Sequence, residues 1–229
     1  KIEASMAQVA LKKAEKQLAA HDTPELQAQV AELRAAAEQE RAANEAEKAR
    51  LAAEDGLVMT LHPAVSRNHS DAMFEQFGAD VGFDIPVAVD FVHHLRPMLN
   101  DVGHAENFRT VLFTIDETVF SREIAPLAGV YPSVYAGAPW WFIDSPDAIL
   151  RFRRAVSETL GYTRTSGFID DTRAFCSIPA RHDMSRRIDA THLAGLVAEH
   201  RMRLEDAVEL VATLPTQQPR EVFRLGESA

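Results

Sequence analysis

The stretch "RTVLFTID" at residues 109–116 decides the fold class. A short apolar run ends there in a carboxylate, and helix-like sequence follows at 121–129. The same succession of apolar run and helix recurs around "LVMTLH" (57–62), "PSVYAG" (132–137) and "SGFIDD" (166–171). Short strands that alternate with helices are typical of a parallel sheet. The sequence therefore predicts an α/β fold with four βα units.

Helices are predicted at 70–78, 85–103, 121–129, 145–161, 181–201 and 204–214. Ser145 and Pro146 mark one start, because serine caps helices and proline suits their first position. A (β/α)8 TIM-like barrel needs eight βα units in about 250 residues, so four units from residue 56 onward amount to half a barrel. An open doubly wound sheet is the other possible arrangement. No glycine-rich phosphate loop follows the strands, which argues against nucleotide binding.

Residues 1–55 differ in composition from the rest of the chain. They are rich in Ala, Glu, Lys, Arg and Gln, and they contain no glycine. Thr23 and Pro24 have the chemistry of a helix start, so we predict two antiparallel helices. The second helix has a mostly alanine stripe, which favours a solvated excursion over a dimerising coiled coil. The predicted organisation is a helical hairpin insertion at 1–55, followed at 56–229 by βα units and C-terminal helices.

Composition excludes some classes of partner. The net charge of the 229 residues is −10 and no basic block stands out, so we expect no nucleic-acid partner. No run reaches the roughly 18–20 apolar residues of a membrane span, so we expect no membrane partner. One cysteine, Cys176, favours a reducing compartment, the cytoplasm, and we expect a small buried residue there. The chain begins like the middle of a helix without an initiator methionine, so we expect a fragment.

Polar groups follow the predicted strands, and in barrels such positions carry the catalytic residues. They are His62, Asp116, the stretch before Trp140, and the Asp170–Asp171 pair. A lone histidine at a strand end is more often structural, but His62 paired with Asp171 could hold a divalent metal with open positions. Asp171 could instead act as a general base.

Two arginines and two tryptophans lie near these strand ends. Arg67 and Arg173 could bind a carboxylate with their planar forks, which would indicate an acidic substrate. Alternatively, each neutralises a neighbouring aspartate. Trp140 or Trp141 could form the wall of a sugar site, or could serve packing alone.

Three stretches resemble the uronate (glucuronate) isomerases of the amidohydrolase superfamily. They are "LVMTLHPAVSRNHSDAMFEQFGADVGFD" (57–84), "APWWF" (138–142) and "FIDDTRAFCSIPARHDMSRRID" (168–189). The resemblance implies a distorted (β/α)8 barrel with helical additions, of which this chain would be the C-terminal half. It also implies aldose–ketose isomerisation of D-glucuronate to D-fructuronate, and of D-galacturonate to D-tagaturonate, by proton transfer through an enediol.

The resemblance also implies roles for individual residues. His62, Asp171 and Arg173 would be catalytic, Arg67 and Trp140 would bind substrate, and Asp171 would also meet a divalent metal such as zinc. The expected partner is a small uronate sugar acid, and the expected state of the protein is a homo-oligomer.

One departure from the family pattern concerns the metal. The family carries a His-x-His pair on its first strand, and no such pair occurs in this chain. We therefore expect activity to require a missing N-terminal half. Two alternatives are a hydrolase-like relative within the superfamily, and a non-catalytic helical interaction module on a degenerate amidohydrolase-like barrel.

Overall fold

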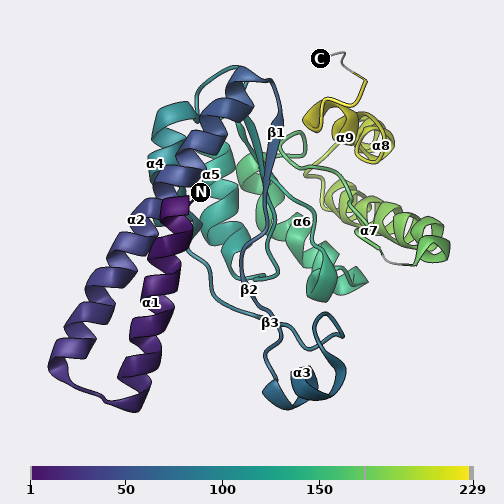
Figure 1. Ribbon diagram of the computed structural model, residues 1–229. Coiled ribbons are helices and arrows are strands. Elements are labelled where there is room, and N and C mark those ends of the chain that lie inside the picture. The colour runs from purple at the N-terminus through teal and green to yellow at the C-terminus, as the bar shows by residue number, and fades with distance from the viewer. Residues whose placement is uncertain (1, 173, 227–229) are drawn as a thin grey trace.

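A computed structural model describes residues 2–172 and 174–226 (Figure 1). Helices α1 (Ile2–Ala20) and α2 (Pro24–Glu54) form a long hairpin on one side of a small central sheet. The Thr23 side chain accepts a hydrogen bond from the Leu26 N–H at 3.3 Å, and Pro24 opens α2 as expected. Helix α7 (Ile178–Ala198) and the helices after it lie on the other side of the sheet.

The central sheet contains three parallel strands in the order β1 (Val58–Leu61), β4 (Arg109–Leu112) and β5 (Val134–Ala136). Each strand lies beside the next one along the chain, with Val58 opposite Arg109 and Thr110 opposite Val134. A doubly wound sheet would reverse its strand order at a switch point. The uniform order instead agrees with a singly wound partial barrel, which confirms the predicted fold class.

The prediction of a fourth strand at 166–171 is wrong. Among the described residues, a single parallel bridge between Ala136 and Thr165 continues the sheet beyond β5. Gly167 has a φ of 76°, a left-handed value that an extended strand does not use. The Ser166 hydroxyl accepts the Ala138 N–H at 3.1 Å, where a strand would continue backbone pairing. The chain therefore turns away from the sheet immediately before the acidic pair.

The predicted helix at 85–103 begins later than expected, with α4 at Phe91–Val102. Residues Ile85–Pro86 form β3 instead, which pairs antiparallel with β2 (Val65–Ser66). The remaining elements are α3 (Asp71–Phe77), a π turn at Phe120–Ile124, α5 (Ala125–Val130), a 3-10 turn at Trp141–Ile143, α6 (Pro146–Leu160), a 3-10 turn at Phe175–Ser177, α8 (Leu204–Thr213) and α9 (Gln217–Val222).

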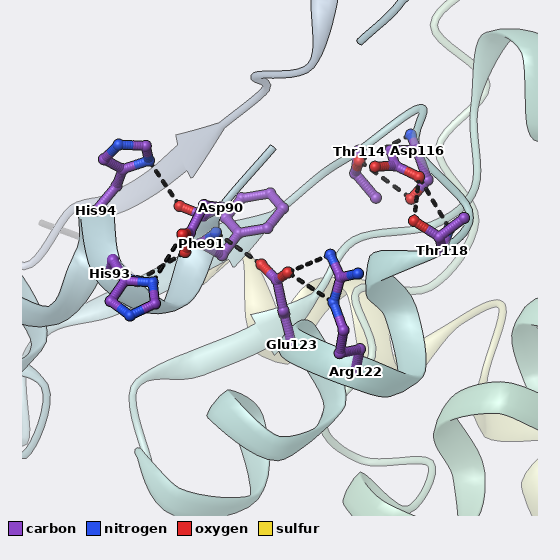
Figure 2. A network of polar contacts seen from close by, with 9 residues as sticks. All are labelled: Asp90, Phe91, His93, His94, Thr114, Asp116, Thr118, Arg122 and Glu123. Atoms are coloured by element: carbon purple, nitrogen blue, oxygen red, sulfur yellow. Dashed lines mark hydrogen bonds and ion pairs between the residues drawn. The ribbon is translucent and has the colours of Figure 1, made fainter. Parts of the chain in front are cut away.

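Figure 2 shows why α4 starts at Phe91. The Asp90 carboxylate accepts the His93 N–H at 2.9 Å, and the buried Glu123 carboxylate accepts the Phe91 N–H at 2.7 Å. Two otherwise unpaired helix-start donors are thereby satisfied. The Asp116 carboxylate accepts the Thr118 N–H at 3.0 Å. This strand-end aspartate thus stabilises its own turn.

The main core lies between the sheet and helices α4, α5 and α6. Phe120 and Phe152 meet edge to face there, with ring centroids 4.7 Å apart. The end of α2 adds Ala46 and Ala49 to this core, so the hairpin is anchored on the α/β part of the chain. Within residues 2–172 and 174–226, no helix combines the length and apolar composition needed to cross a lipid bilayer.

A buried ion pair joins α6 to α7. Arg153 donates from Nε and Nη2 to the two oxygens of Asp189 at 2.6 and 2.8 Å, and both side chains are at most 7% exposed. Arg153 also donates to the Thr165 hydroxyl at 3.3 Å. One guanidinium therefore connects two helices and the residue that ends the sheet.

Candidate active site

A cleft of about 560 Å³ opens beyond the carboxyl ends of the strands. Its lining comes from the loops after β1 and β5, the segment after Thr165 and the start of α7. The lining residues are Arg67, Asp80, Gly82, Asp84, Trp140, Trp141, Asp144, Asp170, Asp171, Thr172 and Arg181. The structure thus brings three of the predicted site residues, Arg67, Trp140 and Asp171, into one cleft. Arg173 lies outside the described residues.

His62 follows β1 and stands beside the wall of this cleft. Its ring lies 4.4 Å from the Phe113 ring and meets the Trp140 ring edge to face at 5.1 Å. Desolvation by the surrounding protein atoms lowers the pKa of His62, and the Asp171 charge partly offsets this effect. The lowered pKa favours the neutral imidazole, the form that can bind a metal or accept a proton.

Gly137 makes the close packing behind His62 possible. A Cβ atom at this position would lie 2.4 Å from the Phe113 ring, which itself contacts His62. We expect Gly137→Ala to destabilise the fold by about 1–3 kcal/mol, because the ring must move to make room. Urea unfolding measures the loss. Gly195→Ala in α7 is the control, since nothing lies within 4 Å of its added methyl, and it should be neutral or stabilising. Equal effects at the two positions would contradict the prediction.

Arg67 is already paired with acidic side chains. It forms an ion pair with Asp80, and its Nε lies 3.4 Å from the buried Asp84 carboxylate. Asp84 also accepts the Asn68 N–H at 2.7 Å, which fixes the loop after β2. In the described residues, Arg67 therefore neutralises neighbouring aspartates. The other interpretation, binding of a substrate carboxylate, stays a prediction. A bound carboxylate would share this guanidinium with those aspartates.

Arg181, at the start of α7, connects two loops of the cleft and was missed in the sequence. It forms ion pairs with Asp144, which follows the tryptophan turn, and with the buried Asp170. Its Nη2 also donates to the Asp170 carbonyl at 3.1 Å. The hydrogen bond with Asp144 is the main cause of a raised pKa of Arg181, and Asp170 adds to it. The only sequence signal was its place inside the stretch 168–189 that resembles the family.

Within the part of the chain that the structure describes, two buried polar atoms of the cleft residues lack a hydrogen-bond partner. They are Nε1 of Trp140, a donor, and Oδ2 of Asp170, an acceptor. An unsatisfied buried polar group costs about 1–3 kcal/mol, and such exceptions call for an explanation such as a functional role.

Two backbone turns of the cleft have left-handed conformations. Trp141 has a φ of 56° and Asp171 a φ of 46°. Aspartate tolerates this region, but a bulky residue such as tryptophan rarely adopts it, and such strain costs of order 1–3 kcal/mol. Strained turns of this kind persist only where surrounding contacts hold them, and they cluster at functional sites.

The described part of the chain does not contain a complete binding site for a divalent metal. No three histidine, cysteine, aspartate or glutamate side chains there are grouped so that they could hold a metal ion. His62 and Asp171 supply two potential ligands at most.

Cys176 is exposed, contrary to the expectation that it is buried.

Three consecutive parallel strands with a polar cleft at their carboxyl edge define a partial (β/α)8-barrel protein. The family model described as Glucuronate isomerase matches residues 4–223. The chain belongs to this family.

Individual relatives agree with the family match. The uronate isomerases of Cutibacterium acnes and Corynebacterium efficiens are 58% and 57% identical to this chain over 77% and 76% of it. The crystal structure of glucuronate isomerase from Caulobacter crescentus matches 80% of the chain with a TM-score of 0.78 and 47% identity. Uronate isomerase from Thermotoga maritima matches 78% with a TM-score of 0.73 and 28% identity.

The chain spans only part of these proteins: 37% of both curated relatives, 38% of the Caulobacter chain and 39% of the Thermotoga chain. The matched family segment includes nearly all of the α1–α2 hairpin as well as the βα units. No finding favours the non-catalytic interaction module.

Proposed function

We propose that this chain contributes the cleft of a uronate isomerase, which interconverts D-glucuronate with D-fructuronate and D-galacturonate with D-tagaturonate. The observation that carries the proposal is the meeting of Arg67, Trp140 and Asp171 in one cleft of a chain that belongs to the family. These residues come from three different loops at the edge of the sheet where barrel enzymes carry their sites.

The proposed chemistry is a proton transfer between neighbouring carbons. In the open-chain sugar acid, the Asp171 carboxylate takes the proton from C2, and an enediol forms. Asp171 then returns the proton to C1 while the C2 oxygen becomes the ketone, so the reaction involves no net oxidation. The neutral His62 ring, beside the Asp171 charge, is suited to pass the hydroxyl proton between the two oxygens.

Substrate recognition is proposed to rest on Arg67, Arg173 and Trp140. The described lining of the cleft holds five aspartates but only two arginines, Arg67 and Arg181. An anionic sugar acid is repelled by this excess of carboxylates, so further positive charge is needed beside it. In the proposal, Arg173 and a divalent cation provide that charge.

The proposal also includes a divalent cation. Uronate isomerases belong to a metal-dependent superfamily, and zinc is the ion we propose. His62 and Asp171 would contribute two ligands, and the others would come from a polypeptide corresponding to the part of the relatives that this chain does not span. The described residues alone do not complete the metal site.

The remaining assignments are also proposals. Residues 1–55 would be a helical hairpin insertion on the βα units of 56–229, since α1 packs against α2 and only the end of α2 enters the main core. Met73, Phe74 and Phe77 of α3 are exposed apolar side chains, which supports a homo-oligomer. The single unpaired cysteine supports a cytoplasmic location.

Complementation tests the proposed function. The chain is co-expressed with the part of the Caulobacter crescentus relative that it does not cover, giving a two-chain enzyme. Supplied with zinc, this enzyme should convert D-glucuronate to a ketose, while either chain alone should not. D-glucose, which lacks the carboxylate, is the control substrate. A two-chain complex that forms but yields no ketose, while the full-length relative does, would contradict the proposal.

A further inference from the structure

Among the side chains that the structure describes, Arg181 bonds both to the loop that carries the tryptophans, through Asp144, and to the segment that carries the acidic pair, through Asp170. We infer that Arg181 is a positioning residue of this site: by bridging Asp144 and Asp170, it holds the turns that present Trp140 and Asp171 to the cleft. This inference rests on the proposed function for its catalytic consequence. The positioning itself rests on the contacts alone.

The geometry of the bridge suits arginine and no other side chain. Nε contacts the Asp170 carboxylate, while Nη2 contacts both the Asp144 carboxylate and the Asp170 carbonyl. The guanidinium is a planar fork whose donors are fixed relative to one another. Its two anchor points are therefore held at a set separation. A lysine at this position has one flexible ammonium and cannot reproduce the fork.

The two anchor points adjoin the two strained turns. Asp144 closes the 3-10 turn that begins at Trp141, and Asp170 immediately precedes Asp171. Trp141 and Asp171 are the left-handed residues of these turns. Strained backbone reverts to a relaxed conformation unless contacts over-determine it. The Arg181 bridge is such a contact on both sides of the cleft.

The held turns also place the two unpartnered atoms at the same cleft. Nε1 of Trp140 is a donor and Oδ2 of Asp170 is an acceptor, and both residues line it. Both atoms are buried, so they depend on the surrounding protein and not on solvent for any partner. Loss of Arg181 would also remove the charged partner of the buried Asp170.

Tryptophan fluorescence tests the positioning without any catalytic assay, because Trp140 and Trp141 are the only tryptophans of the chain. In the 229-residue chain, Arg181→Gln should shift the emission to longer wavelength and increase quenching by acrylamide. Arg181→Lys should not restore either property. The control is Arg187→Gln on the same helix, whose exposed partner is Asp183 at 2.7 Å, and its emission should equal that of the parent.

Kinetics of the two-chain enzyme test the consequence. Arg181→Gln should lower kcat by about 10²-fold, the loss expected for a reacting group displaced by about 1 Å, while KM changes much less. Arg187→Gln should leave both constants unchanged. A purely structural role would lower the amount of folded enzyme and leave the kcat of the folded fraction intact.

Specific outcomes would overturn the inference. Emission and kcat of Arg181→Gln equal to those of Arg187→Gln would do so. If Arg181→Gln does not fold, Asp144→Asn removes one anchor only, and unchanged emission in that variant also overturns the inference. If the parent two-chain enzyme makes no ketose, the proposed function fails, while the fluorescence comparison still decides whether Arg181 positions the tryptophan turn.

Discussion

Asp171→Asn in the two-chain enzyme is expected to lower kcat for D-glucuronate by about 10²–10⁴-fold, the usual contribution of a general base. An amide has nearly the same shape as a carboxylate but cannot accept the C2 proton. Asp171 is exposed in the cleft, so the substitution should leave the free energy of unfolding nearly unchanged. The loss should therefore appear in turnover at unchanged stability.

Exchange of the C2 hydrogen with deuterated solvent gives a second measurement of the same step. It should slow in parallel with turnover, because both need proton removal from C2. Asp183→Asn, an exposed aspartate on α7, is the matched control and should keep full activity. Turnover by Asp171→Asn equal to that of the control would remove Asp171 from the proposed mechanism.

Local patterns made much of the fold predictable. The apolar runs of β1, β4 and β5 and the helix starts after Thr23 and Ser145 depend on residues that are close together in the sequence, although only Thr23 of these two accepts a capping hydrogen bond with its side chain. The prediction of a fourth strand was wrong for a reason that is also local. Gly167 adopts a positive φ, whereas the apolar pattern alone favours an extended backbone. Periodicity records which side chains are buried, but it does not record backbone handedness.

The site was predictable only in part, because its contacts span the chain. Parallel strands bring their carboxyl ends to one edge, which is why Arg67, Trp140 and Asp171 could be expected together. The bridge from Arg181 to Asp144 crosses 37 positions and has no periodic signature. Asp116 shows the reverse case, since a strand-end aspartate that fitted the pattern is used by its own turn.

Asp189→Ala is expected to destabilise the chain by about 3–5 kcal/mol, the largest stability effect we predict for a single side chain. The substitution leaves the Arg153 guanidinium buried between α6 and α7 without its carboxylate. The cost is that of an unpaired buried charge, which exceeds the net stability that the intact pair contributes. Urea unfolding followed by far-UV circular dichroism measures it.

The double variant Arg153→Met with Asp189→Leu separates these two quantities. Since it removes both charges and keeps apolar volume, it should recover most of the stability lost in Asp189→Ala. The exposed pair Arg203–Asp206 is the control, with side chains 77% and 43% exposed, and Asp206→Ala should cost at most about 1 kcal/mol. A double variant no more stable than Asp189→Ala would mean that the hydrogen bond from Arg153 to Thr165, and not the charge of Asp189, holds α6 against the end of the sheet.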